Sequence, residues 1–309
     1  MSAPAFGRVI GRILGDFPGP TLLVTTLIHG NEVAGAIAAE RVLARLRSEE
    51  VSLRGELVVL GGNLGAMREG RRHRGKDLNR VWTDEKIAAL RSRDATTDDA
   101  EDHEQRELLD EIDAVFARAA GKVFAIDLHT TSAAGYPFGI YDTRAQESFA
   151  LRFPLPMIRG LAAALAGVLS SHLVRRGAIA LAVEGGQHDD PKTIDHLEAS
   201  LVVAIEAAGL ATASQLSTLA AARAHLDAVR GGIPRAMEVV ARYAITPDDR
   251  FKMAPGFANI ARVHRGQLLA NDAGGEIRAP AEGLVILPLY QGQGDDGFFF
   301  GREVPHRRP

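Results

Sequence analysis

Short apolar runs alternate with stretches of helical periodicity through the first two thirds of the chain. The apolar runs predict buried strands at residues 21–29, 56–63, 122–129 and 178–186. Apolar residues recur at helical spacing between them, which predicts helices at residues 32–46, 84–93, 105–120 and 153–172. This alternation of strand and helix indicates an α/β fold, with a mostly parallel central sheet flanked by helices.

The pattern changes near residue 231. Strand-like segments between Gly- and Pro-rich turns follow at residues 233–245, 257–271, 276–290 and 297–303. They predict an all-β C-terminal domain, so the chain is expected to divide into residues 1–230 and 231–309. The helical segment 191–230 would connect the two parts.

Each predicted strand of the first domain ends in a polar residue that could bind a ligand or take part in catalysis. The four end at or near His29, Asn63, His129 and Glu184. Ligands of open parallel sheets bind outside the carboxyl ends of the strands, so these side chains are expected to share one rim. Glu32 lies one helical turn beyond His29 and can point the same way.

Two histidines and a glutamate at one rim match the donor set of a catalytic zinc ion. Such a site takes three protein ligands and keeps a fourth position open for water. The chain has no cysteine, so imidazole and carboxylate are the zinc ligands it can offer. A single histidine at a strand end is more often a structural residue, and only the combination points to a metal.

Asp127 and Glu184 each have two interpretations. Asp127 precedes His129 by two residues and shares its face of the strand, where it could orient the imidazole or simply bind loop amides. Glu184 ends the most apolar strand. There it could act as a general base or form an ion pair with Arg175 or Arg176.

Residues 67–82 form the most basic stretch of the chain, MREGRRHRGKDLNRVW. It could be a solvated loop, a nucleic-acid patch or an anion pocket beside the metal. The net charge of −3 argues against nucleic acid. Asn79 and Arg80 would point opposite ways in an extended strand, so both reach one ligand only if the backbone turns there.

The motifs IHGNE, DLNR, DLHT and VEGG, in this order, resemble those of the succinylglutamate desuccinylase/aspartoacylase family of carboxypeptidase A-like zinc hydrolases. The resemblance implies one Zn²⁺ per chain, bound by His29, Glu32 and His129, with Glu184 as the base. It implies that Asn79 and Arg80 bind a substrate carboxylate.

The same resemblance places Arg72 at the scissile carbonyl, although Arg71 and Arg74 crowd the same loop. The family's C-terminal domain can supply a tyrosine to the pocket. Tyr290 is the nearby candidate here, without a firm local match.

These features together predict a zinc-dependent deacylase that cleaves the amide bond of an N-acyl amino acid or a similar small anionic substrate. The alternatives are a zinc carboxypeptidase acting on peptides and a binding module without chemistry. No signal peptide or membrane helix is predicted, so a cytoplasmic protein without membrane or nucleic-acid partners is expected. A homo-oligomer is possible.

Overall fold

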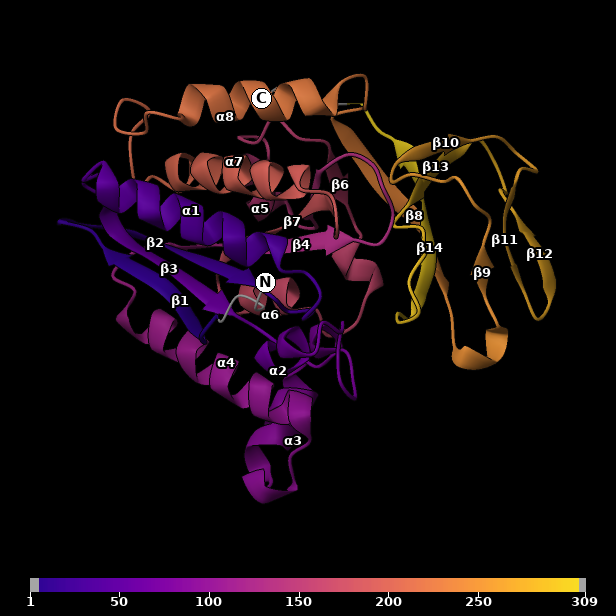
Figure 1. Ribbon diagram of the computed structural model, residues 1–309, viewed down its shortest axis with the longest axis horizontal. Helices are drawn as coiled ribbons and strands as arrows, with labels where there is room; N and C mark the ends of the chain where they lie inside the picture. Colours follow the sequence, from indigo (N-terminus) through magenta and orange to yellow (C-terminus); the bar gives the residue numbers. More distant parts are fainter. Residues whose placement is uncertain (1–5, 306–309) are drawn as a thin grey trace.

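The computed structural model describes residues 6–305 as a layered α/β body with a group of strands at one side (Figure 1). The predicted buried strands form as β2 (Phe17–Thr26), β3 (Arg54–Gly61), β4 (Val123–Thr131) and β7 (Ile179–Gln187). They lie side by side and parallel, in the order β3-β2-β4-β7. This parallel group brings the carboxyl ends of β2, β4 and β7 to one edge.

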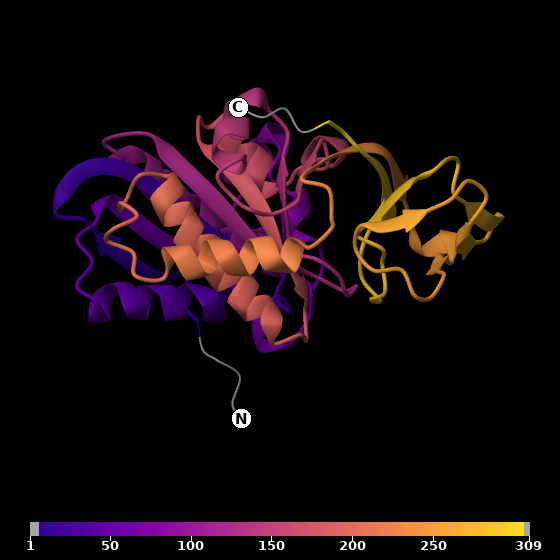
Figure 2. The same cartoon turned by 90° about the horizontal axis from the view of Figure 1, so that it is seen from above.

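Helices cover both faces of these strands (Figures 1 and 2). One face carries α1 (Ala34–Ser48), α7 (Lys192–Ala207) and α8 (Leu219–Arg230), and the other carries α2 (Leu64–Arg68), α3 (Asp84–Ser92), α4 (Ala100–Arg118) and α6 (Leu169–Arg175). Successive residues of β2 point to opposite faces, so Leu22 and Val24 pack on the first side and Leu23 on the second. A strand buried on both faces has no polar side, as its apolar sequence predicted.

The expected helix over residues 153–172 does not form. The stretch instead contains β6 (Met157–Arg159), the 3-10 turn η3 (Ala162–Ala164) and the beginning of α6. Pro154 and Pro156 lack the backbone donor that a helix needs. Gly160 and Gly167 have φ of 85° and 74°, a conformation that interrupts a right-handed helix. The small apolar residues of this stretch therefore produced a misleading helical pattern.

The sheet is mixed rather than mostly parallel, which corrects the sequence-based expectation. Eleven of the described strands share it, in the order β1-β3-β2-β4-β7-β5-β6-β8-β14-β13-β10. The strands β1 (Val9–Leu14) and β5 (Phe138–Tyr141) were not predicted, and both pair antiparallel with their neighbours β3 and β7. Their direction depends on loops that a pattern of apolar residues does not encode.

The C-terminal strands extend this sheet instead of forming a fully separate one. β8 (Ala236–Ala244) pairs with β6 and is followed in the sheet by β14 (Asp296–Glu303), β13 (Gly283–Ile286) and β10 (Ala261–Val263). A second, three-stranded sheet consists of β9 (Lys252–Met253), β11 (Leu268–Asp272) and β12 (Gly275–Arg278).

The remaining helix of the first 230 residues is α5 (Arg144–Ala150). None of the helices within residues 6–305 combines the length and the hydropathy that crossing a bilayer requires.

Candidate active site

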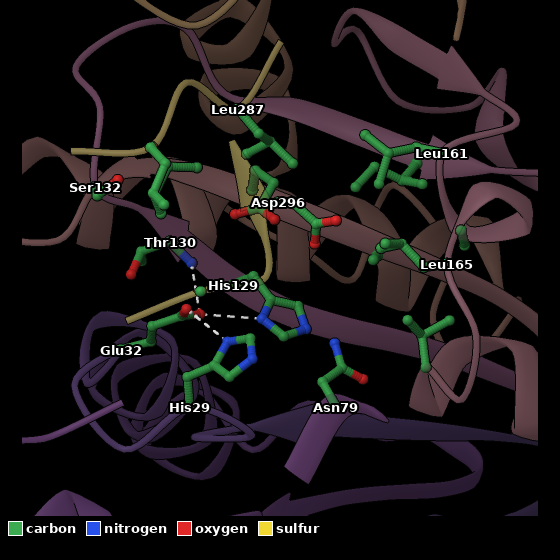
Figure 3. Close-up of a pocket in the computed structure, with 18 of the residues that line it drawn as sticks. His29, Glu32, Asn79, His129, Thr130, Ser132, Leu161, Leu165, Leu287 and Asp296 are labelled. Atoms are coloured by element: carbon green, nitrogen blue, oxygen red, sulfur yellow. Dashed lines mark hydrogen bonds and ion pairs between the residues drawn. The ribbon is translucent and has the colours of Figure 1, made fainter. Parts of the chain in front are cut away.

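His29, Glu32 and His129 meet at the carboxyl edge of the parallel strands. His29 and Glu32 lie between β2 and α1, and His129 lies in β4. One carboxylate oxygen of Glu32 lies 2.7 Å from His29 Nδ1, and the other lies 3.0 Å from His129 Nδ1 (Figure 3). One ligand atom from each residue lies within 4.8 Å of the others, and all three residues are buried.

The outer nitrogen of each imidazole contacts a second carboxylate. His129 Nε2 lies 2.9 Å from Asp127, and His29 Nε2 lies 3.1 Å from Asp77. Each ring therefore presents Nδ1 to the centre while the acid behind it fixes its tautomer and orientation. The alternation of β4 indicated Asp127, whereas Asp77 was missed. The signal for Asp77 was its place at the head of DLNR, two residues before Asn79.

The buried charges shift one another's pKa strongly. Burial alone would raise the pKa of Glu32, but His29 and His129 outweigh it and hold that pKa well below its usual range. Burial alone would lower the pKa of His129, but Asp127 and Glu32 raise it well above its usual range. These shifts favour a negative charge on Glu32 and a positive charge on His129. A bound cation would supply the positive charge beside Glu32 instead.

Glu184 lies in β7 directly opposite His129 in the register of the sheet. Its Oε2 atom is buried and has no hydrogen-bond partner among residues 6–305. Burial raises the pKa of Glu184 to about 8, with His129 opposing the rise and Glu32 adding to it. Arg175 and Arg176, the alternative partners, instead form ion pairs with Asp84 and Asp113.

The basic loop places one of its three crowded arginines at the site. Arg72 lines the cavity, donates to Asp77 at 3.0 Å and lies 3.5 Å from Glu32. Arg71 and Arg74 are exposed and pair with Glu69. The nearby Lys76 also forms ion pairs, with Asp99 and Asp102 at the start of α4.

Asn79 and Arg80 both line the cavity because the backbone turns at η1 (Leu78–Arg80). Asp77 caps this turn by accepting the backbone N–H of Asn79 at 2.7 Å. The Asn79 side-chain oxygen accepts the N–H of Leu169, and its nitrogen is directed toward the cavity (Figure 3). Arg80 forms an ion pair at 2.6 Å with Asp296 of β14, a contact that the sequence did not indicate.

The C-terminal strands and loops form one wall of the cavity. Residues between 287 and 299 line it opposite the imidazoles, including Gln291, Asp295 and Asp296. Tyr290 is not part of this lining; its hydroxyl donates to Ala254 O and accepts the N–H of Phe257. Tyr290, the candidate named from the sequence, therefore does not contribute to the wall of the cavity.

Comparison with known proteins decides the family. The model of the succinylglutamate desuccinylase/aspartoacylase catalytic domain matches residues 18–201, more than half of the chain. The chain belongs to this family. Its members are deacylases, and the match gives no support to the carboxypeptidase alternative.

Individual relatives agree with this assignment. A succinylglutamate desuccinylase of Photorhabdus laumondii is 37% identical over 62 residues, which cover 20% of this chain and 19% of the relative. The matched region thus spans about a fifth of the curated relative.

Solved structures share the fold over nearly the whole chain. A succinylglutamate desuccinylase/aspartoacylase of Rhodobacter sphaeroides superposes with a TM-score of 0.70 at 20% identity, covering 96% of this chain and 88% of that one. A succinylglutamate desuccinylase of Vibrio cholerae gives 0.67 at 16% identity, with 96% and 86% covered.

Proposed function

We propose that the protein is a zinc-dependent deacylase that hydrolyses the amide bond of an N-acyl amino acid or of a similar small amide bearing a carboxylate. The observation that carries this proposal is the buried His29–Glu32–His129 cluster, which shares a cavity with Glu184 and Arg72. The membership of a deacylase family supports the same chemistry.

The residues of the cluster fit a zinc ion. Two imidazole nitrogens and one carboxylate are a common catalytic zinc set, and Asp77 and Asp127 hold the rings in the required tautomer. Zinc held by His29, Glu32 and His129 would lower the pKa of a bound water toward about 7 and polarise the substrate carbonyl.

Glu184 acts in this proposal as the general base. It takes a proton from the attacking water and passes it to the nitrogen of the departing amine. Its Oε2 atom is not engaged by another described side chain, so the oxygen is available to a water. Burial raises the pKa of Glu184, and a zinc cation beside it would lower that pKa and favour the carboxylate form that a base needs.

Arg72 and the η1 turn position the substrate. Asp77 holds the guanidinium of Arg72, which then donates to the carbonyl oxygen as that atom gains negative charge. Asn79 and Arg80 bind the substrate carboxylate and so direct the scissile carbonyl toward the water. Because the oxygen of Asn79 is already bound to Leu169, its amide nitrogen is the end that faces the substrate.

Metal analysis and a substrate panel test the proposal. The purified protein is expected to contain one zinc ion per chain and to release amine from N-acyl amino acids. Glu184→Gln should keep the metal yet lower kcat by at least about 100-fold, the range of a lost general base. Glu85→Gln, at an exposed position of α3, is the matched control.

Two outcomes would overturn parts of the proposal. If Glu184→Gln turns over like the wild type, Glu184 is not the base. If peptides are cleaved while N-acyl amino acids are not, the protein is a carboxypeptidase instead.

The division of the chain at residues 230 and 231 is also proposed. α8 ends at Arg230, and an apolar cluster that includes Met253, Leu269 and Phe298 lies wholly within the later residues. A cytoplasmic location and a homo-oligomeric state stay predictions from the sequence.

A further inference from the structure

The cavity beside the candidate metal site has two chemically different ends. Its empty volume is about 860 Å³, a figure that includes open solvent at the mouth. The polar end contains the imidazoles, Glu184, Arg72 and the η1 turn. The apolar end, here called the aliphatic lobe, is lined by Ile140, Leu161, Leu165, Val168, Leu287 and Phe299.

The aliphatic lobe is built by segments that are far apart in the chain. Ile140 belongs to β5, Leu161 and Leu165 flank η3, and Phe299 belongs to β14. Leu161 and Phe299 are 3% and 1% exposed and belong to the same apolar cluster, so the wall is part of a packed core. Figure 3 shows Leu161, Leu165 and Leu287 across the cavity from His29 and Glu32.

The cations of the cavity are already largely compensated. Arg72 pairs with Asp77 and lies near Glu32, and Arg80 pairs with Asp296. Asp296 also accepts a hydrogen bond from Arg242, so these two arginines and one carboxylate have a net charge of +1, with the exposed Asp295 beside them at the cavity. One further carboxylate can be balanced there, with Asn79 as an additional donor.

A second carboxylate placed in the aliphatic lobe would have no partner of opposite charge. Among the described lining residues, that end offers hydrocarbon side chains and no cation. Burying an unpaired carboxylate against hydrocarbon is strongly unfavourable, whereas burying an alkyl or aromatic group there is favourable.

We propose that the substrate is a monoanionic N-acyl amino acid with one hydrocarbon group, and that the aliphatic lobe and Asp296 together select against dicarboxylic substrates. This inference rests on the proposed function. The hydrocarbon group belongs either to the acyl chain or to the side chain of the amino acid, because both flank the scissile amide. Asp296 is the specificity-determining residue, since it pairs with Arg80 and thereby reduces the positive charge that Arg80 offers to substrate carboxylates.

A panel of amides tests the proposal on the zinc-loaded full-length protein. One arm keeps glycine and lengthens the acyl group from N-acetyl to N-hexanoyl. The other keeps the acetyl group and compares N-acetylglycine with N-acetylleucine and N-acetylphenylalanine. In the arm that uses the lobe, kcat/KM should rise about three- to fourfold per buried methylene. N-acetylaspartate, which has two carboxylates, and N-succinylglutamate, which has three, should both be at least about tenfold poorer than the best apolar substrate.

Binding measured without turnover gives an independent readout. Calorimetry with the Glu184→Gln variant should show tighter binding of the favoured apolar substrate than of N-succinylglutamate. If no amide is hydrolysed by the wild type, the proposed function fails. If amides are hydrolysed but the dicarboxylic ones are preferred and bind more tightly, this inference alone is overturned.

Two substitutions locate the selectivity. Asp296→Asn should release Arg80 and improve kcat/KM for dicarboxylic relative to apolar substrates by about tenfold, and Glu303→Gln, which removes an exposed ion pair of the same strand, should not. Leu165→Ala should instead lower the preference for apolar substrates. Its control is Leu14→Ala, at a 70% exposed position of β1. An unchanged ratio in both Asp296→Asn and Leu165→Ala contradicts the proposal.

Discussion

At the scale of single residues, the site is a set of buried charges that hold one another in place. Glu32 contacts both imidazoles, and each imidazole contacts a further carboxylate. Asp77 has three partners at once: His29, Arg72 and the backbone N–H of Asn79. One carboxylate thereby fixes a candidate metal ligand, a candidate oxyanion donor and the turn that carries the proposed substrate-binding pair, Asn79 and Arg80.

Asp77→Asn should weaken metal binding about 10- to 100-fold, the usual effect of removing the acid behind a ligating imidazole. The amide keeps the shape of the side chain but loses the charge that orients His29 and Arg72. A competition titration against a metal chelator measures this affinity. Asp94→Asn is the control, because Asp94 caps the 3-10 turn η2 (Ala95–Thr97) in the same way but is exposed. Equal affinities in the two variants would show that Asp77 only caps its turn.

At the scale of elements, α6 brings a histidine into the core beside the site. His172 is buried against the ring of Trp82, with 5.7 Å between the ring centroids. Neither of its nitrogens has a hydrogen-bond partner in the described part of the chain. Burial, with Arg176 adding to it, lowers the pKa of His172 to about 4.

The low pKa of His172 predicts that the protein loses stability in mild acid. Below pH ~6.5 the unfolded chain binds a proton at this position and the folded chain does not, until the pH reaches about 4. The free energy of unfolding should therefore fall between these pH values, by at most about 3 kcal/mol from this group. His172→Leu should flatten that slope in urea titrations at several pH values.

His103→Leu is the matched control on α4, where the side chain is exposed. A slope that His172→Leu leaves intact would assign the acid sensitivity to other groups.

At the scale of the whole molecule, Asn259 joins the C-terminal strands to the edge of the sheet that carries the candidate site. It is 1% exposed. Its side chain donates to Thr131 of β4 at 2.9 Å and accepts the backbone N–H of Leu287 at 2.8 Å. Leu287 lines the cavity and has φ of 51°, an unfavourable value for leucine, so its conformation depends on such contacts.

Asn259→Ala should lower the free energy of unfolding by about 1–3 kcal/mol, because it leaves buried polar groups without partners. It should also raise KM, since Leu287 belongs to the cavity wall. Urea unfolding and steady-state kinetics measure the two effects. Asn271→Ala, at an exposed position of β11, is the control and should change neither. An unaltered KM in Asn259→Ala would mean that the wall keeps its shape without this link.

Prediction from sequence succeeded where the signal was local. The apolar runs of β2, β3, β4 and β7 were recognised because a strand buried on both faces needs hydrocarbon at nearly every position. The rule for carboxyl ends of parallel strands then indicated that His29, His129 and Glu184 would meet. It failed over residues 153–172, where Pro154, Pro156 and two left-handed glycines mattered more than apolar spacing.

The sequence alone determined the four parallel strands, the helices α1, α3 and α4, the chemical type of the candidate metal donors and their common edge. All of these follow from patterns within a few residues and from the fixed geometry of parallel strands. Only the tertiary structure decided the mixed sheet, the contact of Asp77 with His29, the pairing of Arg80 with Asp296 and the aliphatic lobe. These depend on which segments the folded chain brings together, and contacts between residues such as 80 and 296 leave no periodic trace in the sequence.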